Sequence, residues 1–373
     1  MSVVAAVPSQ VVKGVVSAEE TVEPFDPAAP FKLVQAEIDA ITERLRLCVV
    51  ETEIPVLAMA SKYLLKSGCE GKRLRPAMSL LLASALDDCP PPSDRGEIDT
   101  RPANQYPHEL RRREQRVAEM SEVIHVASLL HDDVIDDAST RRGIKALNLV
   151  VGNKISILAG DFLLARLAVT MASCRNTEVI EIISGILEDL VAGEIMQMTS
   201  SKEDLVNMDY YFSKTYRKTA SLMSRCCRAV AVFGGHPKSV CDLAAEYGKN
   251  VGMAFQIIDD ILDFTASSDV LGKPALNDVK SGLATAPVLL AMEEFPELKP
   301  LIIRKFRDSG DVEEAVRLVE KSKGIQRARK LAEDHAKQAL EALKSMPAPK
   351  HKHGIVAQAG LVHITEIILK RKK

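Results

Sequence analysis

The sequence is short of several residue types and patterns, and each shortage argues against a class of protein. It has no tryptophan and only 4% aromatic residues, so its core has to be built from Leu, Ile, Val, Ala and Met. A net charge of −2 gives no reason to expect nucleic-acid binding, which needs a basic surface. No uncharged apolar run approaches the roughly 20 residues that span a bilayer. With 46% apolar and 27% charged residues, the composition is that of a globular protein with a substantial core.

Cysteine is present but shows no pattern that builds a disulfide framework or a zinc site. The seven residues are odd in number, scattered and without a C-x-x-C pair, and most lie in apolar helical patterns: Cys48, Cys69, Cys89, Cys174, Cys226, Cys227 and Cys241. We therefore expect small buried thiols in a reducing compartment.

Helical periodicity dominates the chain from about residue 31 onward. Segments such as EVIHVASLLHDDVI and KISILAGDFLLARLAVTMAS place apolar residues at helical spacing, and several are apolar around most of their circumference, as in the buried helices of a bundle. No period-two runs indicate a sheet of any size. We predict one all-α domain over residues 30–373, with an irregular Pro-rich insertion near residues 87–113. Residues 1–29 are interpreted as a weak leader or a disordered extension.

Carboxylates crowd into the stretch LLHDDVIDDASTRRG, residues 129–143. Asp132 and Asp136 are four residues apart, so on a helix their side chains are neighbours, and Asp133 lies beside them. Like charges at this spacing destabilise a helix, and a partly buried carboxylate cluster is unfavourable unless a cation neutralises it. One such motif alone could still be an ordinary acidic helix face.

A second stretch, FQIIDDILDF at residues 255–264, repeats the arrangement with Asp259, Asp260 and Asp263. Two copies, each ending a hydrophobic helix, favour a shared function over two unrelated acidic faces. Oxygen ligands without histidine or cysteine select a hard cation, here Mg²⁺. Because Mg²⁺ completes its coordination with water and substrate phosphates, the pattern predicts a phosphorylated substrate held between two acidic walls.

Clusters of cations accompany the acidic motifs and could match such phosphates. They lie in GKRLRP, directly after the first acidic motif, in KTYRKTASL and in LGKP, and comprise Lys72, Arg73, Arg75, Arg141, Arg142, Lys214, Arg217, Lys218 and Lys273. Each cluster by itself is usually a solvated basic patch. Beside two acidic motifs, they indicate recognition of a diphosphate by arginine forks and lysine charges.

In this combination and order, the motifs resemble those of the trans-prenyltransferases, also called polyprenyl diphosphate synthases. The resemblance runs from about Pro30 to the C-terminus. It implies an all-α fold of isoprenoid synthase type, a single large helical bundle around a central apolar cavity. NDVKSGLATAPVLL and SKGIQRARKLA are most similar to the long-chain branch that makes quinone side chains, described as solanesyl diphosphate synthases or plant geranyl diphosphate synthase-like proteins.

The resemblance also implies roles for matching residues. Mg²⁺ would be held by Asp132, Asp136 and Asp259, with Asp133, Asp260 and Asp263 as further catalytic residues of the two motifs. The allylic diphosphate would contact Lys218, Thr219, Lys273 and Arg141. Isopentenyl diphosphate would be seated by Lys72, Arg75, His125 and Arg142. Gln256 would face the reacting carbons, His131 is interpreted as structural, and Leu283 replaces a lysine that contacts diphosphate in some members.

The implied reaction is Mg²⁺-dependent, successive head-to-tail condensation of isopentenyl diphosphate onto an allylic diphosphate. Short-chain members tend to place a bulky aromatic residue one turn before the first aspartate, where this chain has Ala127 and Ser128. Small residues leave the channel open, and each helical turn adds about 5.4 Å of depth. We therefore expect a product of more than about four isoprene units, since one turn is near the reach of one unit. Leu164, Leu167 and Met171 on a facing helix could end the channel.

The family further implies a homodimer, a mitochondrial or plastid location, and peripheral membrane contact through which a long product leaves toward lipid. A cytoplasmic location is the alternative, because residues 1–29 match a leader poorly. The basic end KRKK, residues 370–373, is interpreted as a solvated terminus, with contact to a membrane surface or closure over the active site as alternatives.

Other functions stay open from the sequence. A short-chain synthase making geranyl, farnesyl or geranylgeranyl diphosphate would share every motif. A catalytically silent subunit of a heteromeric synthase would be expected to lose acidic motifs, and both are intact. A terpene cyclase would need the first acidic motif but not Lys72, Arg75 and His125, and a non-enzymatic bundle that binds metal or lipid would need neither basic set.

Overall fold

The computed structural model describes residues 26, 28–50, 73–87, 109–141, 144–265 and 276–371. Three of the expected ligands, Lys72, Arg142 and Lys273, lie outside these residues. So do nearly all of the segment before residue 28 and the centre of the expected insertion, residues 88–108.

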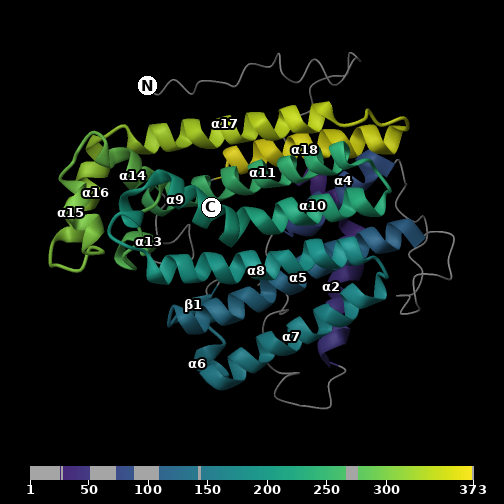
Figure 1. The fold of residues 1–373 in the computed structure, drawn as a ribbon, viewed down its shortest axis with the longest axis horizontal. Helices are drawn as coiled ribbons and strands as arrows, with labels where there is room; N and C mark the ends of the chain where they lie inside the picture. Colours follow the sequence, from purple (N-terminus) through teal and green to yellow (C-terminus); the bar gives the residue numbers. More distant parts are fainter. Residues whose placement is uncertain are drawn as a thin grey trace.

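Long helices lying side by side form the body of the molecule (Figure 1). The elements before residue 200 are α1 (Ala29–Lys32), α2 (Gln35–Val50), α4 (Leu74–Asp87), α5 (Glu109–Ile135), β1 (Thr140–Arg141), β2 (Ile144–Lys145), α6 (Asn148–Val151), α7 (Asn153–Ser173) and α8 (Thr177–Thr199). They are followed by the 3₁₀ turn η3 (Asp204–Val206), α9 (Met208–Thr215), the π-helical turn η4 (Tyr216–Ala220), α10 (Ser221–Phe233), α11 (Lys238–Thr265), α13 (Asn277–Lys280), α14 (Ala286–Met292), α15 (Leu298–Ile303), α16 (Asp311–Lys321), α17 (Gly324–Ser345) and α18 (Lys352–Leu369).

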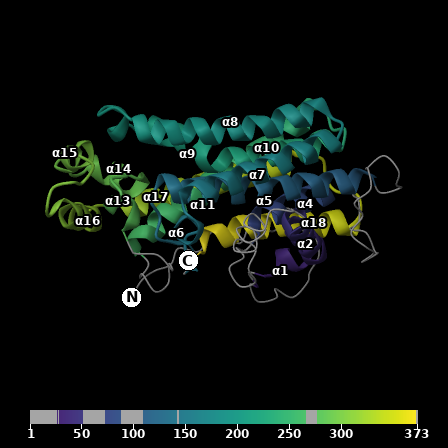
Figure 2. The ribbon, with the colours of Figure 1, turned by 90° about the horizontal axis from the view of Figure 1, so that it is seen from below.

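Packing places two helices, α5 and α11, at the centre of the site-bearing part of the bundle. Helix α11 packs against α10 and α17, while α5 packs against α4, α7 and α10. The short helices α13 to α16 gather at one end of the molecule in both views (Figures 1 and 2). The predicted all-α fold is confirmed. In the part of the chain that the structure describes, the strands are only β1 and β2, a two-residue antiparallel pair.

Two glycines bring α11 unusually close to its neighbours. A Cβ atom at Gly248 would lie 2.5 Å from the backbone oxygen of Met223, and one at Gly252 would lie 2.6 Å from the Cα of Ala220. Any larger residue would therefore push α11 away from α10 and η4. Close backbone packing thus fixes the position of α11, which carries the second acidic motif, relative to α10 and η4.

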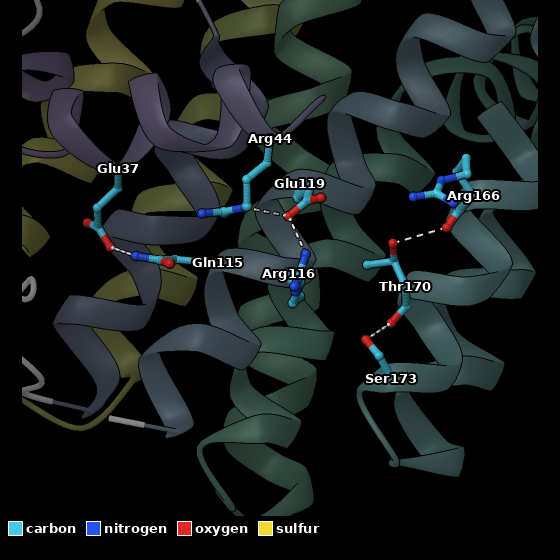
Figure 3. A network of polar contacts seen from close by, with 8 residues as sticks. All are labelled: Glu37, Arg44, Gln115, Arg116, Glu119, Arg166, Thr170 and Ser173. Atoms are coloured by element: carbon cyan, nitrogen blue, oxygen red, sulfur yellow. Dashed lines mark hydrogen bonds and ion pairs between the residues drawn. The ribbon is translucent and has the colours of Figure 1, made fainter. Parts of the chain in front are cut away.

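A network of charged side chains is buried near the N-terminal end of α5. Arg111, 1% exposed, donates from Nε and Nη2 to the Glu37 carboxylate of α2 at 2.9 and 2.8 Å. Glu119, about two turns after Arg111 on α5, accepts hydrogen bonds from Arg44 Nε and Arg116 Nη1 at 3.0 Å each (Figure 3). Each of these buried charges has a partner of opposite sign, which is the condition for keeping a charge in a protein interior.

The structure changes one expected boundary. Helix α5 begins at Glu109, so the last five residues of the segment expected to be irregular, 109–113, are helical. Arg111, within this stretch, pairs with Glu37 of α2, a long-range partner that cannot be recognised from local pattern.

The cysteines that the structure describes behave as expected. Cys174, Cys226, Cys227 and Cys241 are buried free thiols, and burial raises the pKa of Cys226 to about 12. These thiols therefore act as small apolar side chains.

Candidate active site

The first acidic motif lies at the C-terminal end of α5. The helix ends at Ile135, so Asp132 and Asp133 occupy its last turn, and the amide of Asp136 still donates to the backbone oxygen of Asp132 at 2.8 Å. The carbonyl end of a helix carries partial negative charge, which makes it an unfavourable place for carboxylates. Their position therefore works against helix stability, as functional residues often do.

Asp133 is turned toward the β1–β2 hairpin. Its carboxylate is 1% exposed and accepts a hydrogen bond from Arg141 Nε at 2.8 Å, with a second contact from Arg141 Nη2. Asn148 Nδ2 donates to the backbone oxygen of Asp133 at 3.0 Å. The motif is thereby fixed to the hairpin, and Arg141 is held beside it.

Asp132 and Asp136 are not neutralised in this way. Burial raises the pKa of Asp132 to about 6 and also raises the pKa of Asp136. Lys218 opposes both shifts and Glu194 adds to both, so the charges of these two side chains lie near the same carboxylates. Among the residues that the structure describes, no hydrogen bond or ion pair is made by either carboxylate.

The second acidic motif occupies the last turns of α11, and its three aspartates differ sharply. Asp259 has a 38% exposed side chain and accepts from Arg371 Nη2 at 3.1 Å. The Arg371 guanidinium also lies 4.2 Å from the ring centroid of Phe255. The basic end of the chain thus contacts the second acidic motif. The solvated terminus favoured by the sequence is wrong for Arg371.

Asp260 and Asp263 direct their oxygens into the protein. Asp263 accepts from the backbone amides of Asn277 and Asp278 at 3.1 and 3.0 Å, and so holds the start of α13. Asp260 is buried and accepts from Tyr211 Oη at 2.6 Å. Of the three, Asp259 is the carboxylate open to a ligand.

A chain of hydrogen bonds connects Asp260 to the basic turn η4. Thr219 Oγ1 donates to Gln256 Oε1 at 2.9 Å, and Gln256 Nε2 donates to Asp260 Oδ1 at 2.9 Å. Burial raises the pKa of Asp260 to about 6, while hydrogen bonds from Tyr211 and Gln256 oppose the shift. Gln256 and Thr219, expected near the substrate, are oriented by this buried carboxylate.

The turn η4 carries Lys218 and Thr219 in a π-helical conformation, which is uncommon and frequent at functional sites. It is clasped between α11 at Gly252 and α8 at Gly193, where a Cβ would lie 2.8 Å from Lys218 Cγ. Lys218 forms an ion pair with Glu194 of α8. Arg217, from the same basic cluster, instead pairs with the buried Asp189 at 3.1 Å.

A pocket of about 210 Å³ opens beside these groups. Its lining includes Asp136, Glu194, Tyr211, Lys214 and Leu283. The pocket therefore extends from Asp136 of the first acidic motif to α9, and Leu283 is part of its lining.

The anchors expected for isopentenyl diphosphate are described only in part. Arg75 lies half-buried in the first turn of α4, close enough to Cys226 of α10 for its charge to oppose the rise that burial causes in the pKa of that thiol. His125 lies half-buried on α5 two turns before Asp132, and its backbone oxygen accepts from Ser128 Oγ at 3.0 Å. His131 packs over Gly160 of α7 with its Nε2 3.2 Å from the Ile157 oxygen, in keeping with a structural role.

Glu194 and Tyr211 escaped the sequence analysis, and Arg371 was included only in the basic end KRKK, for which a solvated terminus was favoured. Tyr211 supports Asp260, Glu194 pairs with Lys218, and Arg371 contacts Asp259. Each contact joins distant parts of the chain, so no local spacing could reveal it.

The donor set fits Mg²⁺. Asp132, Asp136 and Asp259 supply carboxylate oxygens alone; Asp132 is half-buried and Asp136 exposed, and Asp259 is held by an arginine. Within the described residues, no group of three His, Cys, Asp or Glu side chains converges on a single metal position.

Comparison with known proteins identifies the family. The polyprenyl synthetase family profile matches residues 54–319. Solanesyl-diphosphate synthase 1, mitochondrial, of Oryza sativa subsp. japonica is 48% identical over 344 residues, covering 92% of this chain and 79% of the relative. Other relatives are named hexaprenyl pyrophosphate and decaprenyl-diphosphate synthases. The chain belongs to the polyprenyl synthetase family, and it is a prenyltransferase.

Solved structures agree with this assignment. The apo form of an Arabidopsis medium/long-chain length prenyl pyrophosphate synthase is 41% identical, with a TM-score of 0.73 over 92% of this chain and 99% of that one. A Caulobacter crescentus polyprenyl synthase complexed with calcium and isoprenyl diphosphate is 27% identical, with a TM-score of 0.78 over 95% and 100% of the two chains. The isoprenoid synthase type of fold expected from the motifs is thereby confirmed.

Proposed function

We propose that this protein condenses isopentenyl diphosphate repeatedly onto an allylic diphosphate to make a long all-trans polyprenyl diphosphate, for a ubiquinone or plastoquinone side chain. The arrangement of charged side chains in the candidate active site supports this function. Half-buried Asp132 and exposed Asp136 lie near Lys218, and Asp259 lies in the last two turns of α11. Long-chain relatives of up to 48% identity support the product class.

Charge governs the first chemical step, in which the allylic carbon–oxygen bond ionises to an allylic cation and diphosphate. Lys218 and Thr219, held in η4, would bind the leaving diphosphate, where negative charge grows in the transition state. Asp132, Asp136 and Asp259 would hold Mg²⁺, which when bound supplies further positive charge to the departing oxygens. Lys273 and Arg141 would add contacts to the same diphosphate.

The second step forms the new carbon–carbon bond. Arg75, His125, Lys72 and Arg142 would seat isopentenyl diphosphate so that its double bond attacks the cation, and orientation supplies much of the acceleration. Gln256, fixed between Thr219 and Asp260, would face the reacting carbons. The released diphosphate accepts the proton lost afterwards, and apolar walls exclude water from the cation.

Product length would depend on the space beside α5 beyond the first motif. Ala127 is 1% exposed and Ser128 is half-buried, and α5 packs there against α7, which carries buried Leu167. Small residues at these two positions leave room for a growing chain. Leu164, Leu167 and Met171 are the candidates for its end.

The test is a synthesis assay with radiolabelled isopentenyl diphosphate, farnesyl diphosphate and Mg²⁺, followed by chromatography of the dephosphorylated products. A ladder that ends in one long polyprenol is expected. Absence of extractable label would overturn the synthase function, and a single short product would overturn only its long-chain part. A cyclic hydrocarbon formed from the allylic substrate alone would identify a terpene cyclase.

We also propose that the protein forms a homodimer. Large apolar side chains are exposed on three consecutive helices, α6 to α8: Leu149, Val150, Ile157, Leu158, Val169, Val191, Ile195 and Met198. Helix α7 is long and apolar enough to cross a membrane, and only 28% of its most apolar window is buried within the chain. A second copy would cover this surface, because apolar patches of this size rarely face water.

Sedimentation of the detergent-free protein tests the second copy. A dimer is expected for the wild type and a monomer for Leu158→Glu. A monomeric wild type that binds lipid vesicles would instead make this face a membrane contact.

Location and metal complete the proposal. A mitochondrial or plastid address is supported by relatives whose names specify mitochondrial or chloroplastic/mitochondrial proteins. A fluorescent fusion at the C-terminus would show the compartment.

Removing Mg²⁺ with EDTA should abolish synthesis.

A further inference from the structure

Glu194 of α8 and Lys218 of η4 form an ion pair in which both partners are largely buried. The side chains are 14% and 25% exposed. Gly193 allows α8 to approach η4 so closely that a Cβ there would lie 3.0 Å from Arg217 Cβ and 3.1 Å from the amide nitrogen of Lys218. The backbones on both sides are therefore fixed, and the pair is preformed.

The pair lies next to the first acidic motif. Glu194 and Asp136 both line the pocket described above, so the pair and the first motif belong to one site. A diphosphate that arrives at Lys218 would also meet Glu194, a like charge. Lys218 cannot pair fully with Glu194 and with a diphosphate at the same time.

We propose that Glu194 is a positioning residue that competes with diphosphate for Lys218. Glu194 pairs with the Lys218 ammonium group in the empty site. It pairs with that group again when inorganic diphosphate leaves after each condensation. The proposal rests on the function inferred above and deepens it. Breaking a buried ion pair leaves its carboxylate unpaired, so Glu194 weakens diphosphate binding relative to a neutral residue. Weaker binding speeds release, which a synthase that repeats its reaction needs in every cycle.

Glu194→Gln keeps the size of the side chain and removes its charge. Calorimetric titration with inorganic diphosphate and Mg²⁺ should show Kd lowered about tenfold, a modest value for the coupling of a close charge pair. In steady state, KM for the allylic substrate and kcat should both fall, because binding is tighter and release slower. Glu188→Gln, an exposed glutamate on the same helix, is the matched control and should change neither.

Two further variants separate competition from a structural effect. Glu194→Asp should return Kd and kcat part of the way to wild-type values. In a Lys218→Ala background, Glu194→Gln should have no further effect on Kd, because the competition runs through Lys218.

Unchanged diphosphate affinity in Glu194→Gln would overturn the proposal. Loss of Mg²⁺-dependent diphosphate binding would also overturn it, since Glu194 would then be a metal ligand. Because diphosphate binding is measured without synthesis, these outcomes are distinct from failure of the wild type to make polyprenyl diphosphate, which would overturn the proposed function.

Discussion

The two ends of α5 differ in whether their charged side chains are neutralised by partners of opposite sign. Near the N-terminal end, Arg111 and Glu119 are buried and each is matched by oppositely charged side chains within hydrogen-bond distance. At the C-terminal end, burial raises the pKa of Asp132 to about 6, and no such contact neutralises it. One helix therefore contains a structural charge cluster and, at its other end, a cluster that is left unsatisfied for a ligand. Unmatched charge, rather than charge itself, distinguishes the site.

The largest expected effect comes from Asp132→Asn. Removing the charge should lower kcat by about a thousandfold or more, as removal of transition-state stabilisation does elsewhere. Thermal unfolding of the metal-free protein should occur at the same or a higher temperature, because a buried unmatched carboxylate destabilises the fold. Synthesis assays and calorimetry check this, and a clear loss of stability would remove the contrast between the two ends.

Arg111→Met should give the opposite pattern. Removing the guanidinium leaves Glu37 and Glu114 buried without their partner, which destabilises the protein by about 3–5 kcal/mol. Activity per folded molecule should be retained. Urea unfolding and active-site titration measure the two quantities, and Arg116→Met, a more exposed arginine of the same network, should have a smaller effect.

The raised pKa of Asp132 also predicts how stability changes with pH. The carboxyl titrates near pH 6 when folded and near the usual value of about 4 when unfolded, so between these values the folded state binds more protons. Lowering the pH from 7 to 5 should therefore raise the free energy of unfolding, by about 1 kcal/mol from this residue. The difference between wild type and Asp132→Asn, measured without metal, isolates it. A difference that does not vary with pH would mean that Asp132 is not destabilised by burial.

Ala127→Phe should have the smallest effect on total turnover and a clear effect on product length. Ala127 is 1% exposed and lies on α5 between the two charged regions, and α5 packs against α7, so an aromatic ring would intrude on the space proposed for the growing chain. Chromatography should show shorter products, with Ala127→Val intermediate. Unchanged chain length in both variants would remove the channel beside α5 from the explanation of product length.

Much of the fold could be predicted from the sequence because helical periodicity is a local property. Apolar spacing indicated α5, α7, α8 and α11, and the two aspartate motifs indicated where the site would lie. The start of α5 at Glu109 was missed, because Arg111 reads as one of a run of exposed charges until α2 brings Glu37 to it.

Within the site, the sequence could not separate aspartates of one motif from one another. Asp259, Asp260 and Asp263 look equivalent in FQIIDDILDF, yet only Asp259 is open, while Asp260 supports Gln256 and Asp263 holds α13. Their directions follow from the packing of α9, α13 and α14 around the end of α11.

Spacing and residue type alone are sufficient to predict a helical bundle with two carboxylate motifs and accompanying basic clusters. Which of these charges are neutralised depends on how distant segments pack. Arg141 holds Asp133, Glu194 holds Lys218 and Arg371 reaches Asp259 across 112 positions of chain. A charge acquires its role from its partner and its burial, and both are set only when distant segments pack together.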